Sequence, residues 1–459
     1  MKTDTALVSR RLPSRLGLRF ALVATIAALG FISGKGPGLE QVYAQAPGEV
    51  SEEAEQRRTQ RVPAMREQAF NRLSEAQEAL DENDTAKALE ALTRLEGQRG
   101  LNAYEAASMW NMRAYIHFST DNYTRAIEAY ERVLSFSPEV PLALELGTMY
   151  ALGQLYFVQE DYQQAIHYLN RWFDLVETPS TQSYVFLAQA YYQLNDFRNV
   201  IPAVQSAMDL ARQRGDEVRE NWWLLKRAAY YEMENFAKVI EILEILVQDF
   251  PSKDYWVQLS GLYGQEGQQK KQIGAIWAAY MQGYLDQERE ILNVAGLLQQ
   301  EEAPYWAARI MERAIEDGVV ESDRRNLQSL AQAWQMAQNL EKAIPVYHRA
   351  AERADDGELH YRLAQLYLDR DDCDNSIRSA ERAIAAGGVD RAGQIYLIKG
   401  MCEYNLTRYD TALNTFAEGL RIARRDRAEQ DISALTQWRN HVEREKRRQE
   451  QLARAADPA

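Results

Sequence analysis

The chain has 459 residues, 46% of them hydrophobic, and a formal net charge of −14. This length exceeds what one ordinary globular core accommodates, so the chain must be divided into domains or built from stacked repeats. The acidic balance argues against nucleic acid as a partner. A nucleic-acid binder needs a basic stripe that displaces counterions from phosphates, and no such stripe runs through the sequence.

The first 44 residues have the pattern of an export signal. A basic region comes first, formed by Lys2, Arg10, Arg11, Arg15 and Arg19. The apolar run that follows, Phe20 to Ile32, is too short to cross a bilayer comfortably, since a spanning helix needs about 20 residues. With the small residue Ala44 as cleavage site, we expect a periplasmic protein that begins near Gln45. The alternative is an uncleaved signal that anchors the chain in the inner membrane.

Residues 45–62 are rich in glutamate, arginine and glutamine, which predicts a solvated linker. Helical periodicity begins at Pro63. The first repeat, around Met65 to Arg99, keeps an apolar face of leucine and alanine but lacks the aromatic positions of later repeats. This suits a terminal cap, which has no preceding neighbour to fit.

From this point a helix-turn-helix signature recurs about ten times. Its first helix carries large and small apolar residues at fixed spacing, as in Met149, Leu152, Gly153 and Tyr156. Its second helix contains one residue, mostly small or β-branched, that recurs every 33 to 39 residues. The ten aligned positions are Ala88, Ala126, Ala165, Val200, Val239, Gln272, Ala307, Ala343, Ser376 and Ala412. The pattern is that of tetratricopeptide repeats, whose period is about 34 residues.

Small residues in the first helix, such as Gly153 and Gly400, predict a close approach of the second helix. No repeat can bury its apolar face alone, so neighbouring repeats stack into a solenoid with a concave inner surface. We therefore predict an all-α tetratricopeptide-repeat solenoid, a right-handed superhelix of about ten repeats, over residues 63–426.

Residues 427–459 predict a C-terminal capping helix and a charged tail. Ile432, Leu435, Trp438 and Val442 lie on one stripe of that helix, which suits a cover for the tenth repeat. The basic residues within 444–448 either bind an acidic surface or form a solvated helix face.

The sequence offers no catalytic motif. Its five histidines have no metal-ligand spacing, and the glycines from Gly261 to Gly267 fall within a repeat rather than in a phosphate-binding loop. A nucleophile elbow is also missing. We expect a non-enzymatic protein without metal or cofactor.

The two cysteines fall in neighbouring repeats. Cys373 opens the second helix of the ninth repeat, and Cys402 lies late in the first helix of the tenth. These helices should pack antiparallel, which places both sulfur atoms near the same level. In an exported protein such a pair either forms a disulfide or stays as two small core residues, and the sequence leaves both interpretations open.

The inner positions of the first helices predict the partner-binding groove. Tyrosine and glutamine dominate them, and rigid amphipathic rings with two-way hydrogen bonding suit an extended peptide or a partner helix. The other interpretation is that some of these aromatic residues only fill gaps between repeats. The candidate groove residues are Asn111, Tyr115, Phe118, Tyr150, Gln154, Phe157, Gln189, Tyr192, Tyr231, Gln332, Gln335, Tyr361, Gln365 and Tyr404.

Residues 101–105, 146–157, 160–162 and 255–264 carry a narrower resemblance. They are similar to a family of exported bacterial tetratricopeptide proteins described as components of TonB transport systems, and the likeness extends from about Arg61 to Glu443. The resemblance implies a periplasmic accessory of the proton-driven complex that powers outer-membrane uptake, with TonB-, ExbB- or ExbD-type proteins as partners. It brings no residue-level binding map.

We therefore expect a periplasmic scaffold that binds a protein or peptide partner through its concave groove. It would meet a membrane only through its partners or through an uncleaved signal. Two alternatives remain open. One is a general envelope-assembly factor for outer-membrane proteins, pili or polysaccharide export, and the other is a docking subunit for a separate enzyme.

Overall fold

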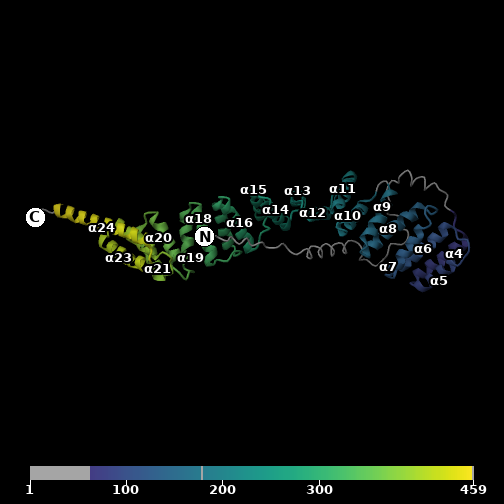
Figure 1. The fold of residues 1–459 in the computed structure, drawn as a ribbon, viewed down its shortest axis with the longest axis horizontal. Helices are drawn as coiled ribbons and strands as arrows, with labels where there is room; N and C mark the ends of the chain where they lie inside the picture. The colour runs from purple at the N-terminus through teal and green to yellow at the C-terminus, as the bar shows by residue number, and fades with distance from the viewer. Residues whose placement is uncertain (1–62, 177–178, 457–459) are drawn as a thin grey trace. The chain divides into compact units, whose positions relative to one another are not determined.

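The computed structural model describes residues 63–176 and 179–456, and its regular elements there are all α-helices. The predicted signal (1–44) and linker (45–62) lie outside the described residues. The described helices form consecutive pairs followed by one final helix (Figure 1). The pairs are α4 (Glu67–Asp81) with α5 (Thr85–Glu96), α6 (Ala103–Ser119) with α7 (Tyr123–Leu134), α8 (Leu142–Val158) with α9 (Tyr162–Asp174), α10 (Thr181–Gln193) with α11 (Phe197–Arg214), α12 (Glu220–Glu232) with α13 (Phe236–Asp249), α14 (Lys253–Gln265) with α15 (Gln269–Met281), α16 (Glu288–Gln300) with α17 (Pro304–Glu316), α18 (Arg324–Met336) with α19 (Leu340–Ala351), α20 (Glu358–Leu368) with α21 (Cys373–Ala386), and α22 (Ala392–Asn405) with α23 (Tyr409–Arg425); the final helix is α24 (Glu429–Ala456).

The chain divides into two compact units, and the boundary between Ile242 and Leu243 falls inside α13. In each unit a second helix packs on its own first helix and on the first helix of the next repeat, as α7 does with α6 and α8. The core is accordingly a line of apolar clusters between helices. One such cluster in the second unit runs from Ile276 in α15 to Leu366 in α20.

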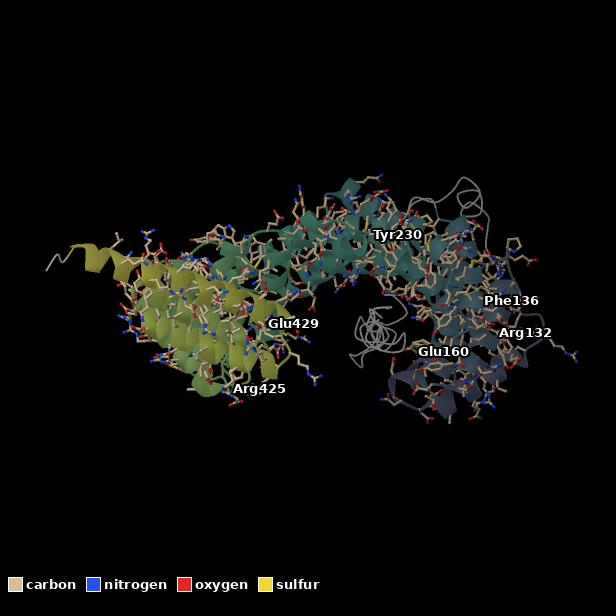
Figure 2. The ribbon with its side chains drawn as sticks, turned by 60° about the vertical axis from the view of Figure 1, so that its left-hand side comes forward. Arg132, Phe136, Glu160, Tyr230, Arg425 and Glu429 are labelled. Carbon is tan, nitrogen blue, oxygen red and sulfur yellow. The ribbon has the colours of Figure 1, made fainter. Side chains whose placement is uncertain are left out.

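The same turn joins the two helices of every repeat. It contains one residue with φ between 55° and 70°, five positions before the aligned second-helix residue. These residues are Asn83, Asp121, Glu160, Asn195, Glu234, Gly267, Glu302, Gln338, Asp371 and Thr407. In most repeats the next residue is aspartate or asparagine, whose side chain caps the second helix, as Asp161 does by accepting from the backbone N–H of Gln164. Figure 2 labels Glu160 in this turn.

The turn residue of the tenth repeat is strained. Thr407 is β-branched and has φ 61°. The left-handed conformation costs a residue with a Cβ about 1–2 kcal/mol, whereas glycine adopts it freely but loses about 0.5–1 kcal/mol more entropy on folding. Thr407→Gly should therefore raise the free energy of unfolding of the second unit by about 0.5–1 kcal/mol, measured by urea denaturation. Asp371→Gly should raise the free energy of unfolding by less, because aspartate tolerates the left-handed conformation better than threonine does. A urea midpoint below that of the wild type for Thr407→Gly would contradict the strain argument.

The expected close approach of paired helices is confirmed. Nine of the ten aligned second-helix residues are buried, and the exception is Gln272. Gln272 faces Gly264, where an added Cβ would lie 2.6 Å from its amide nitrogen. A Cβ on Gly153 would likewise press against Leu169 at 3.0 Å, and one on Gly400 would overlap the ring of Phe416.

The capping role predicted for the last helix is also confirmed. α24 packs against α23 and α22, with Leu435 and Val442 fully buried beside Phe416. Arg425 ends α23 and Glu429 begins α24, as Figure 2 shows at the turn between them. Within the described residues, none of the helices is long and apolar enough to span a membrane.

A buried carboxylate fixes the start of the first repeat. Glu105 is fully buried at the beginning of α6 and accepts hydrogen bonds from Arg66, the residue before α4, through the backbone N–H (2.8 Å) and Nε (2.9 Å). The backbone N–H of Asn102 donates to its other oxygen at 3.0 Å. The hydrogen bonds from Arg66 lower the pKa of Glu105 to about 2.

Removing this charge should weaken the first unit. We expect Glu105→Gln to lower its free energy of unfolding by about 1–2 kcal/mol at pH 7, because hydrogen bonds to a charged acceptor are lost. The pKa of Glu105 in the folded protein lies below its ordinary value of 4.5, so this stabilisation is present above pH 4.5 and disappears as the pH falls towards 2. The urea midpoints of the wild type and of Glu105→Gln should therefore converge as the pH falls from 4.5 towards 2. Glu90→Gln, in an exposed pair with Arg94, is the control and should change little.

Candidate functional site

Four aromatic side chains occupy the same position in four successive repeats of the first unit. They are Phe118 in α6, Phe157 in α8, Tyr192 in α10 and Tyr231 in α12, each eight residues before the aligned second-helix residue. Phe118 is 37% exposed and Tyr231 is 36% exposed, while the other two are half-buried. We call these four residues the aromatic row.

Each ring of the row is braced by the aromatic residue that opens the following second helix. The ring centroids of Phe118 and Tyr123 lie 6.1 Å apart. The equivalent pairs, Phe157 with Tyr162, Tyr192 with Phe197, and Tyr231 with Phe236, have centroid distances of 5.2, 5.3 and 5.8 Å. A braced ring loses little rotamer freedom when a partner covers it, which favours binding.

Polar side chains accompany the row. Tyr115, Gln154 and Gln189 stand three residues before row members, and side chains three apart share one helix face. Asn111 lies one turn further back on α6. All four are half-buried, so their hydrogen-bonding groups are within reach of a ligand that covers the row. The face thus combines apolar rings with amide and hydroxyl groups.

Tyr150 lies against aromatic side chains of its own repeat and of the next one. The sequence places it on the groove side of α8, but its ring packs against Trp172 and Phe186, with centroids 5.3 and 5.9 Å away. Burial also raises the pKa of its hydroxyl. Tyr150 therefore takes the second of the two roles open to such residues and fills the gap between repeats. Phe157 of the row shares the contact with Phe186, with ring centroids 5.3 Å apart, and is the most enclosed of the four rings in its aromatic contacts.

The predicted groove residues of the second unit form no equivalent row. Tyr404 is covered by the capping helix, where its hydroxyl lies 3.1 Å from Nε2 of His441. Gln335 accepts a hydrogen bond from the hydroxyl of Tyr347 at 2.8 Å, and Gln365 accepts one from Arg362 at 3.3 Å. The remaining two differ: Tyr361 is partly buried against an apolar cluster, and Gln332 is exposed.

The two cysteines meet in the core of the second unit. Cys373 and Cys402 are buried in one cluster with Ile377, and both are free thiols. Burial raises the pKa of the Cys402 thiol to about 12, and the neighbouring Cys373 thiol adds to the shift. Because the thiolate is the attacking species in disulfide exchange, a thiol with so high a pKa is a poor nucleophile near neutral pH.

The disulfide stays a prediction that this proximity permits. Forming it would transfer two protons and two electrons from the two thiols to a disulfide donor. The bond would close a loop of about 30 residues and, if unstrained, raise the free energy of unfolding by about 3–4 kcal/mol. Because repeat stability is nearly a sum of local terms, reduction should first loosen α21 and α22. Non-reducing mass spectrometry of protein exported to an oxidising compartment checks this, and two free thiols there would contradict it.

Among the described residues, no three His, Cys, Asp or Glu side chains are grouped so as to hold a metal ion. Sequence reasoning overlooked three partly exposed aromatic residues in the second unit: Trp277, Tyr305 and Trp306. The available signal was their occurrence at repeat positions that are otherwise almost all polar.

Comparisons with known proteins agree with the repeat pattern. Residues 73–141 and 361–428 match the tetratricopeptide repeat family, and residues 119–207 match a family described as anaphase-promoting complex, cyclosome, subunit 3. No curated protein matches the chain.

Similar solved structures are distant. A tetratricopeptide repeat protein from Parabacteroides merdae has 13% identity and a TM-score of 0.32, over 60% of this chain and 100% of that one. Naa15/Naa10 bound to HypK-THB has 13% identity and a TM-score of 0.38, over 82% and 67%. YrrB, a TPR protein with an unusual peptide-binding site, has 14% identity and a TM-score of 0.30, over 40% and 89%. Likeness at this level assigns no function.

The paired helices and their common turn define the class of fold, a tetratricopeptide-repeat solenoid, and the family matches within residues 73–141 and 361–428 agree with it. The predicted all-α fold is confirmed. Proteins of this class are typically non-catalytic scaffolds whose extended inner surfaces bind other proteins.

Proposed function

We propose that this protein is a periplasmic scaffold whose aromatic row binds a segment of a partner protein. The observation that supports this proposal is the aromatic row, in which each of four successive repeats of the first unit presents one braced, partly exposed ring. Partly exposed aromatic rings beside hydrogen-bonding groups are typical of interface centres. Their regular placement suits a peptide that crosses successive repeats, either extended or helical.

The finer part of the proposal is a role within a TonB-type energy-transduction system, with TonB-, ExbB- or ExbD-type proteins as partners. Its support is the sequence resemblance, together with the export-signal pattern of residues 1–44. Two of the resembling segments, 101–105 and 146–157, reach into α6 and α8, the helices that carry Phe118 and Phe157. The alternatives remain an envelope-assembly factor and a docking subunit for an enzyme.

Quantitative purification from the cell envelope tests the proposal. The full-length protein carries a C-terminal tag and is cross-linked in cells, then compared with a Phe118→Ala/Tyr231→Ala variant by mass spectrometry. We expect TonB-system proteins to be enriched on the wild type and depleted on the variant. Enrichment of assembly or polymer-export proteins, or of one enzyme, would instead select the corresponding alternative. The same spectra report whether the mature chain begins near Gln45.

A further inference from the structure

One partly exposed face of α15 differs from that of the other second helices. It carries Gly274, Trp277, Ala278 and Met281, and Met281 is 66% exposed. An added Cβ on Gly274 would meet nothing within 4 Å, so the surface one turn before Trp277 is open. Where α15 has Trp277, the other repeats have no large apolar residue: Thr93, Glu131, Asn170, Gln205, Glu244, Glu312, His348, Glu381 and Ala417.

The next second helix, α17, begins with two exposed aromatic residues. Tyr305 is 47% exposed and Trp306 is 52% exposed. In the other repeats these two positions are mostly polar: Ala86 and Lys87, Thr124 and Arg125, Gln163 and Gln164, Arg198 and Asn199, Ala237 and Lys238, Lys270 and Lys271, Glu341 and Lys342, Asp374 and Asn375, Asp410 and Thr411. The repeat fold therefore does not require aromatic side chains there.

These side chains form one continuous line of rings. Trp277 lies 5.5 Å from Trp306, which lies 5.5 Å from Tyr305, and Tyr305 lies 5.7 Å from the buried Trp334 of α18, measured between ring centroids. We call Gly274, Trp277, Met281, Tyr305 and Trp306 the α15/α17 patch. Tryptophan, tyrosine and methionine are enriched at protein interfaces, and a contiguous exposed apolar patch marks an interaction site.

The charge around the patch identifies the kind of partner. α15 is the one second helix without an acidic residue, in a chain of net charge −14. It carries Lys270 and Lys271, and Arg309 follows Trp306 by one turn of α17. Lys271 lies 3.7 Å from Glu244, whereas no ion pair within the described residues engages Lys270 or Arg309. These two cations are available to an acidic partner.

We propose that the α15/α17 patch binds an amphipathic segment of a partner protein whose large apolar side chains are flanked by acidic residues. This surface lies on the second unit and is separate from the aromatic row, so it stands independently of the function proposed above.

Selection with a displayed library of random 16-residue peptides tests this proposal on the full-length protein. Counter-selection uses Met281→Gln/Trp306→Asn, because glutamine and asparagine stand at the equivalent positions of other repeats and leave the net charge unchanged. A second variant, Lys270→Gln/Arg309→Gln, removes the two available cations. Met336→Gln, an exposed methionine at the end of α18, is the matched control. Circular dichroism verifies that each variant is folded.

We expect the enriched peptides to be acidic and rich in large apolar residues. They should bind the Met281→Gln/Trp306→Asn variant at least tenfold more weakly and the control with unchanged affinity. For the charge variant, we expect a several-fold loss at low salt that disappears at high salt. Enrichment of neutral or basic peptides, equal binding to the patch variant, or the lack of any enrichment over counter-selection would overturn the proposal. Patch-dependent dimerisation in light scattering, or patch-dependent binding to phosphatidylglycerol vesicles, would overturn it in favour of a second copy or a membrane.

Discussion

Replacing Phe118, Tyr192 and Tyr231 together by alanine is expected to reduce partner capture to the background level. Truncating one anchoring aromatic residue typically costs at least about 2 kcal/mol of binding, or about a factor of 30. Phe118 and Tyr231 are more than one-third exposed, so most of the loss should fall on binding rather than on folding. Envelope purification with quantitative mass spectrometry measures the capture, and thermal unfolding measures the stability.

The bracing contacts set the limits of this prediction. Each removed ring gives up a contact with its neighbour worth about 0.5–1.5 kcal/mol, so the first unit should be slightly less stable but still folded. Tyr162→Ala is the matched control, since it removes a bracing ring that packs on Phe157 and should lower the unfolding midpoint without abolishing capture. The row would not be the binding site if the triple variant captured its partner at wild-type level. Loss of capture through changes at Arg444, Arg447 or Arg448 would point instead to the basic segment of α24.

Gly400→Ala is expected to destabilise the second unit by about 1–3 kcal/mol, the usual cost of overpacking a filled core. The new methyl group would overlap the ring of Phe416, which is fully buried beneath the capping helix and cannot swing away. Urea denaturation followed by tryptophan fluorescence measures the change. Combining Gly400→Ala with Phe416→Leu should recover part of the loss relative to the sum of the single variants, because the smaller side chain makes room for the methyl.

At a second glycine, substitution by alanine is expected to stabilise the protein instead. Gly261 lies in the middle of α14, and a Cβ there would meet nothing within 4 Å. Gly261→Ala should therefore raise the free energy of unfolding by about 0.5–1 kcal/mol, as alanine favours a helix more than glycine does. Equal effects of the two substitutions would show that helix propensity, rather than the contact with Phe416, decides their stability.

Much of the architecture could be predicted from the sequence, because the same pattern of helix-packing and turn residues occurs in every repeat. The aligned residues from Ala88 to Ala412 predicted the place of each second helix, and nine of the ten are buried. Averaging over copies makes this signal strong even where one copy departs from it, as at Gln272. The capping role of α24 could be predicted equally well, because the apolar stripe from Ile432 to Val442 can be buried only against the preceding repeat.

The site was less predictable, because a side chain at a groove position is accessible only if no neighbour covers it. Tyr150 and Tyr192 both satisfy the groove pattern, yet Tyr150 lies between Trp172 and Phe186. Tyr404 is likewise covered by His441 and Trp438 of α24, which lie more than 30 residues further along the chain. Helix register specifies the direction of a side chain, whereas the neighbouring repeat decides its exposure.

By itself, the sequence determined the number of repeats, the pairing of their helices and the position of each turn, since these follow from local periodicity and residue size. Only the tertiary structure decided which aromatic residues remain open to a partner. It also decided that Trp277 and Trp306 of two different repeats join in one partly exposed patch. Exposure and proximity depend on contacts between repeats, and a pattern that is read within one repeat at a time does not contain them.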